Sequence, residues 1–287
     1  MDRDSMGSKN IYGETQGIRL LRALAEEGKI IFSAREAKTM ALQLGINPGY
    51  LDNLLPYMVQ GGWLTRLYRG LYAYSGTLPG EIQVHPFVIA TRLVSPSAIS
   101  HWSALNYHGL TEQVPVIVTA FTPKKVVTPS MRKDHPNKPA GRHAWEIASI
   151  HYEYVTVKQE HFFGIEEVWI GENFRVPITD RERTVLETFI ASRMFGGIGE
   201  ALGLLENHLH EMALEKLVAY AIQYGKASVA KRLGWALEKA GANENILAPL
   251  LNLPISGYRV LDPTLPAQGP CDKRWMIQDN LTGKKSR

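Results

Sequence analysis

The sequence predicts an α+β protein, in which an N-terminal winged helix-turn-helix precedes a larger mixed domain with an antiparallel sheet and a C-terminal helical part. Three observations lead to this prediction. Apolar residues recur at helical spacing through the first 60 residues, with glycine and proline where helices would end and begin. Runs of β-branched residues follow in the middle of the chain. Helical spacing returns from residue 179 to about residue 251.

Composition limits the class of protein further. The chain has 287 residues, of which 45% are hydrophobic and 21% charged, and this is typical of one large or two modest folded domains. Cys271 is the single cysteine, so disulfide scaffolds and zinc sites built on several thiolates are excluded, and a reducing cytoplasm is the expected setting. Residues 1–10 are polar and no apolar window is long enough to span a bilayer, so we expect neither a signal peptide nor a membrane partner.

The N-terminal region begins with two predicted helices. Apolar residues at helical spacing predict a first helix over residues 16–27, which Gly28 ends. Ser33 and Glu36 have the spacing of a capping box, in which the serine hydroxyl and the glutamate each bond a free amide at the start of a helix. A second helix is therefore expected over residues 34–44.

A third helix follows at the spacing that a helix-turn-helix requires. Gly45 breaks the second helix, and Pro48 suits the first turn of the next one because its missing amide has no partner there in any case. The crossing of the two helices needs a small residue, a glycine four residues later, and apolar residues six and nine beyond that glycine. Ala41, Gly45, Leu51 and Leu54 meet all four requirements.

The wing is predicted directly after the third helix. Residues 63–74 alternate as two short strands around a basic turn at Arg69 and Gly70. Pro56 lies inside the third helix, where it removes a hydrogen bond and crowds the carbonyl of Asp52, so we expect a kink there.

The remaining chain is expected to mix strands and helices. Ser95 and Pro96 have the pattern of a helix start, and Gly109 that of its end. Strands are expected over residues 115–121, in a strand or hairpin over 143–157, and in a pair over 168–178; a capping box at 179–182 opens a helix through Met194. The expected domains are residues 1–76, the winged helix-turn-helix, and residues 77–287, divided into a sheet-containing part (77–178), a helical part (179–255) and an irregular tail (256–287).

Five segments resemble one family. They are SHWSALNYHGL (Ser100 to Leu110), TDRERTVLETF (Thr179 to Phe189), the FGGIGEAL segment after it, RLGWALEKAG (Arg232 to Gly241) and YRVLDPTLPAQGPCDKRW (Tyr258 to Trp275). In this order, and following a winged helix, they are similar to the AbiEi-type antitoxins and transcriptional regulators of AbiE abortive-infection toxin–antitoxin systems. The resemblance extends over nearly all of the chain.

The resemblance implies a function. Its N-terminal winged helix would bind repeats in the operon's own double-stranded promoter DNA, and its larger C-terminal domain would counter a cognate nucleotidyltransferase toxin. The family offers no catalytic residues to transfer to this chain, so neither an enzyme activity nor a cofactor is expected. The oligomeric state does not follow from the sequence.

The predicted DNA contacts come from the winged helix. Basic side chains near phosphates supply affinity, while amides and phenols can contact base edges in the major groove. On this basis we expect DNA contacts from Ser33, Arg35, Lys38, Asn47, Tyr50, Asn53, Arg66, Tyr68 and Arg69. The alternative is that the charged members are ordinary surface residues.

A second basic segment lies between residues 122 and 143. It holds six basic residues and one acidic residue among four prolines, which predict an extended loop without regular structure. We expect it to contact nucleic acid or an acidic partner, with a solvated insertion as the alternative. Its basic residues are Lys124, Lys125, Arg132, Lys133, Lys138 and Arg142.

Other chemistry-bearing residues favour structural roles. His208 and His210 are two apart rather than four, so they lack the spacing of metal ligands on a helix, and His101 and His108 are interpreted as packed or capping side chains. The glycines at 196–199 lack the strand and the Gly-Lys-Ser ending of a phosphate loop, and the lone thiol of Cys271 is interpreted as buried or inert.

The sequence leaves two alternative functions open. One is a nuclease-like C-terminal domain that would hold magnesium between carboxylates, for which Glu166 and Glu167 beside Trp169 are the nearest approach. The other is an interaction module whose C-terminal helices hold a toxin directly.

Overall fold

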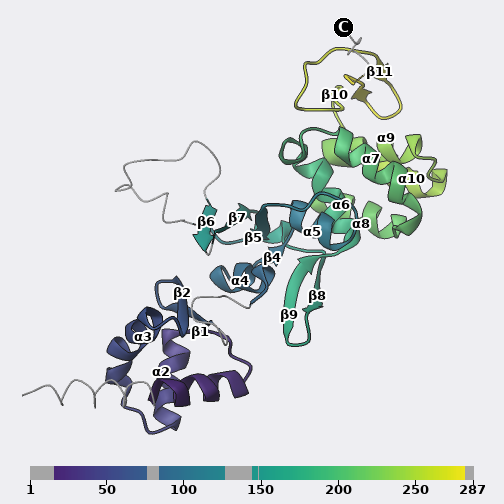
Figure 1. Cartoon of the computed structure of the whole chain (residues 1–287). Coiled ribbons are helices and arrows are strands. Elements are labelled where there is room, and N and C mark those ends of the chain that lie inside the picture. Colours follow the sequence, from purple (N-terminus) through teal and green to yellow (C-terminus); the bar gives the residue numbers. More distant parts are fainter. Residues whose placement is uncertain (1–15, 76–83, 127–143, 148, 282–287) are drawn as a thin grey trace, which may run out of the picture. The chain divides into compact units, whose positions relative to one another are not determined.

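The computed structural model describes residues 16–75, 84–126, 144–147 and 149–281 (Figure 1). Its elements confirm the predicted α+β class. Packing divides the chain into two compact units: one comprises residues 1–95 with 146–151 and 169–176, and the other comprises residues 96–145, 152–168 and 177–287. The predicted domain division stays a prediction, because its boundary at 76/77 falls among residues outside the described ones.

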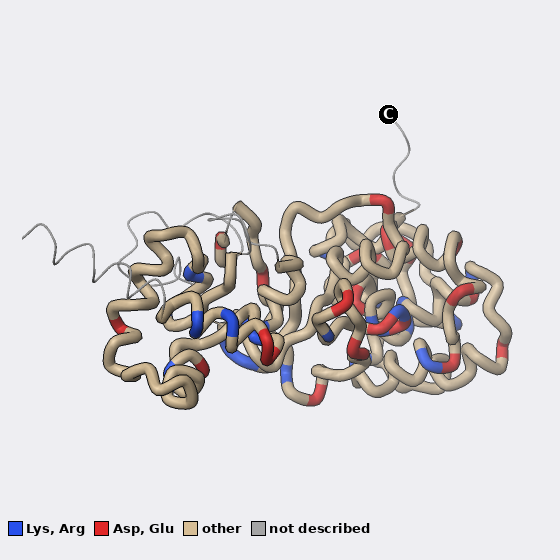
Figure 2. The backbone as a smooth tube through the Cα atoms, turned by 60° about the horizontal axis from the view of Figure 1, so that its bottom comes forward, with Lys and Arg blue, Asp and Glu red and all other residues tan. Residues whose placement is uncertain are grey.

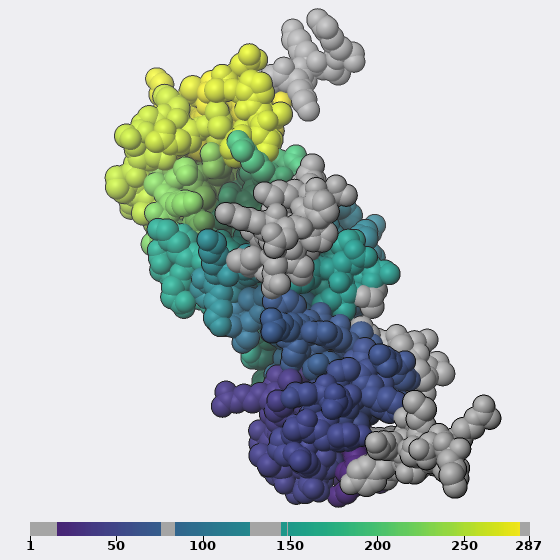
Figure 3. All heavy atoms as spheres, turned by 90° about the vertical axis from the view of Figure 1, so that its left-hand side faces the viewer, coloured from purple at the N-terminus to yellow at the C-terminus, as the bar shows by residue number. Residues whose placement is uncertain are grey.

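The first unit begins with the predicted helices. A helix over residues 16–26 is followed by α2 (Ala34–Gln43), a 3₁₀ turn η1 (Pro48–Tyr50) and α3 (Leu51–Gln60). Pro48 opens the 3₁₀ turn, and Pro56 lies within a helix that continues past it to Gln60. Figure 3 shows the side chains of these elements, in purple and dark blue, packed into a continuous body.

The crossing of α2 and α3 has the predicted packing. Ala41 and Leu51 are fully buried, and Leu54 is 1% exposed, in one apolar cluster. Gly45 has φ +70°, a left-handed conformation that glycine adopts without steric cost. The four landmarks therefore have the burial and backbone conformation that their spacing predicted.

The wing is a three-stranded sheet with the order β1-β3-β2. Strands β2 (Leu64–Tyr68) and β3 (Leu71–Tyr74) form the predicted hairpin. Strand β1 (Ile31–Ser33) was not predicted, because three residues between two helices are too few to show alternation; it pairs antiparallel with β3, and Phe32 is opposite Tyr72. Helix α4 (Pro86–Leu93), which the His85 side chain caps, completes this unit.

A six-stranded sheet has the order β6-β7-β5-β4-β9-β8 (Figure 1). Its strands are β4 (Ala98–Ile99), β5 (Ile117–Thr122), β6 (Ala144–Ile147), β7 (Ile150–Thr156), β8 (Ile165–Ile170) and β9 (Phe174–Thr179). The predicted strands at 115–121, 143–157 and 168–178 are thus confirmed in position. Because β4 runs antiparallel to β5 and parallel to β9, the sheet is mixed, with antiparallel pairing at β4–β5.

The helix expected from Ser95 is wrong at its start. Ala98 and Ile99 form the central strand β4, and both are fully buried between β5 and β9. Burial on both faces of the sheet outweighs the local helix-start pattern of Ser95 and Pro96. The helix of this region, α5 (His101–Tyr107), begins after the strand and ends before Gly109 as expected.

The helical part begins at α6 (Arg181–Ile190), one residue later than predicted. Asp180, not Thr179, is the N-cap, and its carboxylate accepts the amide of Arg183 at 2.9 Å. A 3₁₀ turn, η4 (Ser192–Phe195), ends this segment. Four further helices follow: α7 (Gly199–His208), α8 (Leu214–Tyr224), α9 (Ala227–Lys239) and α10 (Glu244–Leu251). A short 3₁₀ turn, η5 (Leu209–Glu211), lies between α7 and α8, and another, η3 (Gln159–His161), lies between β7 and β8. The predicted interruptions at 195–199 and at Gly225 are confirmed.

The tail predicted as irregular contains a small sheet. Strands β10 (Arg259–Val260), β12 (Ile277–Gln278) and β11 (Cys271–Asp272) each have two residues, too few for a sequence pattern to reveal. Trp275 packs back on the helices, fully buried, and its indole donates to Glu238 at 2.8 Å. The Cys271 thiol, interpreted from the sequence as buried or inert, is exposed, which rules out the first of these alternatives.

The contact between α9 and Trp275 predicts the effect of adding one methyl group. A Cβ at Gly234 would overlap the Trp275 ring, whereas a Cβ at Gly203 of α7 would meet nothing within 4 Å. Gly234→Ala should therefore destabilise the protein by about 1–3 kcal/mol, and Gly203→Ala should stabilise it by about 0.5–1 kcal/mol because alanine favours a helix. Urea unfolding monitored by circular dichroism measures both. Equal effects of the two substitutions would contradict this packing.

Candidate nucleic-acid interface

The candidate interface lies around the start of α2. The Ser33 hydroxyl accepts the Glu36 amide at 3.1 Å, and the Glu36 carboxylate accepts the Ser33 amide at 2.7 Å, so the predicted capping box is present. The Ser33 hydroxyl also donates to Glu36 at 2.7 Å. Its proposed role in DNA contact would have to coexist with this bond.

Hydrogen bonds within the capping box stabilise the ionised form of the Glu36 carboxylate. Burial raises the pKa of Glu36, but bonds from the Ser33 amide and hydroxyl, together with the charges of Arg92 and Lys29, lower it more, so the pKa lies below its ordinary value of 4.5. Glu36 is therefore ionised at neutral pH. Its negative charge at the helix N-terminus also interacts favourably with the helix dipole.

The wing turn is bonded to α2. The Ala34 amide donates to the Gly70 carbonyl at 2.8 Å, which joins the first residue of the helix to the turn between β2 and β3. The strand register shifts between Arg66 and Tyr68, so β2 has a bulge at the wing. Arg66 and Arg69 are exposed, and Arg35 is exposed on α2 close to this junction in the chain.

The polar face of the third helix has amides rather than cations. Asn47 and Asn53 are exposed, and Tyr50 is half-buried against the apolar cluster. The Asn47 side-chain oxygen accepts the Gly49 amide at 2.9 Å and so caps the 3₁₀ turn. The charged residue of α3 is Asp52, and the Lys38 ammonium pairs with it at 3.1 Å.

Figure 2 marks the described Lys and Arg residues in blue and the Asp and Glu residues in red along the backbone. The wing presents the exposed cations Arg66 and Arg69, whereas Lys38 is partly neutralised by its acidic partner. An exposed pair of this kind contributes little to stability, so phosphate could compete for the lysine. Of the second basic segment, Lys124 and Lys125 are exposed after β5, and the other four residues, Arg132, Lys133, Lys138 and Arg142, lie outside the described residues.

The second unit holds a buried polar cluster that the sequence analysis missed. Glu187 of α6 is 2% exposed and accepts the backbone amide of His101 at 2.9 Å. The Arg183 guanidinium is also buried, 3.5 Å from Glu187 and 4.5 Å from the centre of the Phe163 ring. The sequence pattern predicted a helix here but not that the charged side chains of Arg183 and Glu187 are buried. Burial of α6 on all sides depends on distant parts of the chain, so no local pattern indicates it.

Further hydrogen bonds near this cluster join α5 to the start of α6. His108 of the first segment bonds the Thr179 carbonyl at 2.7 Å, and Arg181 donates to the His108 carbonyl at 3.2 Å. His101 has φ +54°, a left-handed conformation that is strained for histidine, and the Glu187 carboxylate holds its amide there. The interpretation of His101 and His108 as packed side chains agrees with these contacts.

The residues considered for metal binding and for phosphate binding do not form such sites in the described part of the chain. Glu166 and Glu167 are exposed on the edge strand β8, and among the described residues no group of three or more His, Cys, Asp or Glu side chains is placed to hold a metal ion. At the glycines before α7, the Asp262 carboxylate accepts the Ile198 amide at 3.0 Å and the Thr264 amide at 2.7 Å. The Asp262 carboxylate thus occupies the Ile198 amide, which lies in the glycine segment where a phosphate loop would bind its phosphate.

Comparison with known families agrees with the fold of the first unit. Residues 19–75 match the family described as transcriptional regulator, AbiEi antitoxin. The matched range comprises α2, α3 and the three strands of the wing. The resemblance noted from the sequence is confirmed over this range, and within it lie all nine predicted DNA contacts.

One solved structure extends the similarity to most of the chain. The crystal structure of the Rv2827c protein from Mycobacterium tuberculosis superposes with a TM-score of 0.60 at 13% sequence identity, covering 92% of this chain and 90% of that chain. It establishes that the two chains share a fold. No curated protein matches the sequence. No helix in the described ranges combines the length and apolar character that crossing a bilayer would need.

The capping box predicts a pH-dependent effect on stability. Ser33→Ala should cost about 1 kcal/mol at neutral pH because an N-cap bond is lost. Since the pKa of Glu36 is lowered in the folded protein, its contribution is complete above about pH 4.5 and is lost as the pH falls through the folded value. The difference between wild type and Ser33→Ala should therefore shrink on acidification. Chemical unfolding at several pH values measures it, with Thr39→Ala on the exposed side of α2 as the control.

Proposed function

We propose that this AbiEi-type protein is a DNA-binding transcriptional repressor and antitoxin of a toxin–antitoxin operon, and that its winged helix binds repeats in the promoter of its own operon. One observation supports the proposal above all. The helix crossing at Ala41 and Leu51 and the arginines of the wing belong to a single small body whose sequence matches the antitoxin regulators.

Affinity would come from contacts with phosphates. Arg66 and Arg69 on the wing and Arg35 on α2 are exposed, and the bond between Ala34 and Gly70 keeps the wing turn beside the start of α2. Cations on neighbouring elements can bind phosphates on either side of a groove, and each neutralised phosphate releases condensed counterions. Lys38 would join them after exchanging Asp52 for a phosphate.

Sequence preference would come from the third helix. An exposed asparagine can form two hydrogen bonds to adenine in the major groove, and Asn53 is exposed in the first turn of α3. Asn47 and Tyr50 precede it in the 3₁₀ turn. Because α3 carries Asp52 and no cation, base contacts of this helix would choose among sites while the wing supplies affinity.

The antitoxin activity is assigned to the second unit. We propose that it counters a nucleotidyltransferase toxin without catalysing a reaction, in the cytoplasm where the promoter lies. The family of the first unit supports an antitoxin role in general. Co-purification of the full chain with the product of the adjacent gene distinguishes direct holding of the toxin from neutralisation without contact.

Removal of wing charge should weaken DNA binding without changing the fold. Arg66→Ala and Arg69→Ala should each weaken binding to duplex DNA from the chain's own upstream region by about 3- to 10-fold and reduce the salt slope by about 1. Fluorescence anisotropy over a salt series measures both. Arg259→Ala, which removes an exposed arginine from the second unit, should change neither quantity. Full affinity in both wing variants would exclude the wing as a contact.

The third helix should control discrimination rather than affinity. Asn53→Ala should cost about 1–3 kcal/mol on the preferred duplex and leave binding to unrelated DNA unchanged. The measured quantity is the ratio of the two Kd values. Gln43→Ala, at the exposed end of α2, is the amide-to-methyl control. An unchanged ratio in Asn53→Ala would show that another residue reads the sequence.

A further inference from the structure

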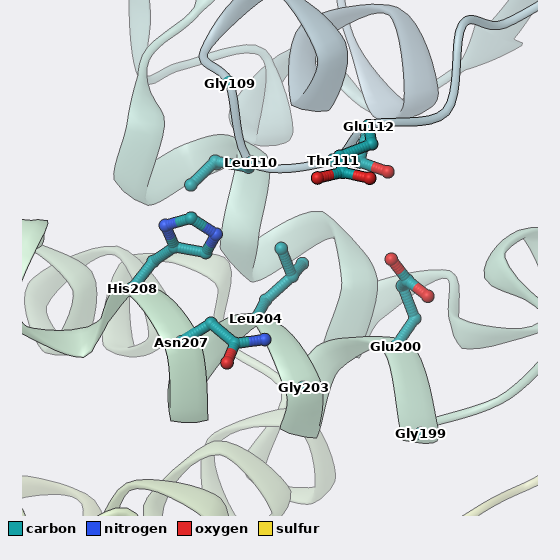
Figure 4. Close-up of a pocket in the computed structure, with 10 residues that line it drawn as sticks. All are labelled: Gly109, Leu110, Thr111, Glu112, Gly199, Glu200, Gly203, Leu204, Asn207 and His208. Carbon is teal, nitrogen blue, oxygen red and sulfur yellow. The ribbon is translucent and has the colours of Figure 1, made fainter.

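The second unit contains a cleft along α7 that the proposed DNA binding does not use. Its volume is about 430 Å³, and it lies between α7 and the loop that follows α5. We call it the α7 cleft; its lining residues are Gly109, Leu110, Thr111, Glu112, Gly199, Glu200, Gly203, Leu204, Asn207 and His208 (Figure 4).

Two of the α7 residues that line the cleft are glycines and therefore have no side chain. Gly199 and Gly203 are one helical turn apart, and a Cβ built at either would meet nothing within 4 Å. Gly199 is the first residue of α7, whereas Gly203 lies in its interior, where glycine costs about 1 kcal/mol relative to alanine. Here the missing side chains leave space in which a ligand could lie directly against the helix.

Carboxylate, imidazole and amide groups lie around this space. In Figure 4 the Glu200 carboxylate points across the cleft toward the loop that carries Glu112, and the His208 ring and the Asn207 amide face the same space. The His208 Nδ1 is 3.0 Å from the Glu211 carboxylate, which only accepts, so Nδ1 is the donor.

Positive charge is absent from the cleft wall. Among the ten lining residues there is neither lysine nor arginine. The nearby Arg181 is engaged elsewhere, since it pairs with Glu211 and donates to the His108 carbonyl. Two carboxylates facing a space without a cation of the protein create a negative potential there, which favours a positively charged occupant.

The interior end of the cleft is apolar. Leu110 and Leu204 are 3% and 4% exposed and lie between the loop and the helix. A ligand that contacts both parts of the cleft would therefore have an aliphatic chain packed against the two leucines. Its other end would be a cationic group between Glu112 and Glu200. Lysine, arginine and small aliphatic amines have this combination.

We propose that the α7 cleft binds a guanidinium or ammonium group carried on an aliphatic chain, with Glu112 and Glu200 as its charge partners. The group could belong to a small amine or to a basic side chain of a protein. The chemistry of recognition is the same for both, and it is independent of the winged helix.

Calorimetric titration of the full-length protein at low ionic strength tests the proposal. Agmatine, which carries a guanidinium and an ammonium, and a short arginine peptide are the two cationic probes, and succinate is the anionic control. Binding of either cationic probe at one site, with no binding of succinate, supports the proposal, and the probe that binds more tightly identifies the source of the cation. Absence of binding by both cationic probes overturns it.

Two kinds of variant distinguish the cleft from general surface charge. Glu200→Gln and Glu112→Gln should each weaken the cationic probe about tenfold or more, because a charged hydrogen bond is lost. Glu215→Gln, an exposed glutamate of α8 outside the cleft, should not. Gly203→Met should abolish binding by filling the cleft, and an unchanged or higher Tm would show that the fold is intact.

DNA affinity provides the last control. The variants of the cleft should bind upstream DNA as the wild type does. Equal weakening of the cationic probe by Glu200→Gln and Glu215→Gln, or undiminished binding in Gly203→Met, would show that the probe binds elsewhere and would overturn the assignment of the cleft.

Discussion

The hydrogen bond from the Ala34 amide to the Gly70 carbonyl fixes the wing against the start of α2, and the proposed DNA interface depends on it. The capping box beside it holds Ser33 and Glu36 in place, so the strand β1 leads directly into the helix. A cation on a hairpin can bind phosphate at a defined position only if the hairpin is attached to the helices that enter the groove. The bond makes two elements of the first unit act as one surface.

The charges of this surface suggest which element would supply DNA affinity and which would supply sequence preference. The wing carries exposed arginines, while α3 carries an acid and uncharged amides, so affinity and choice of sequence are assigned to different elements. The pairing of Lys38 with Asp52 would reduce the attraction of α2 and α3 for the phosphates of bound DNA. Such an interface would bind unrelated DNA less strongly than one with a basic recognition helix, because non-specific affinity follows the number of phosphates neutralised.

Local patterns predicted the first unit well and the second only in part. The capping box, Gly45 and the Leu51 and Leu54 spacing act over a few residues, and each is present as expected. Ala98 and Ile99 are different, because they form a strand only through partners that are distant in the sequence. For the candidate site, the sequence identified which residues are polar and exposed, but the bond between α2 and the wing and the pair Lys38–Asp52 required the fold. The α7 cleft likewise depends on glycines whose empty surroundings no sequence pattern reveals.

Amide hydrogen exchange of the full-length protein, with and without duplex DNA from its own upstream region, tests the central claim most directly. The wing, the start of α2 and the turn before α3 should exchange more slowly in the complex, since DNA would cover these backbones and restrict their opening. The helices of the second unit should be unaffected. Protection confined to the second unit, or no protection at low salt, would contradict the assignment of the winged helix as the DNA-binding surface.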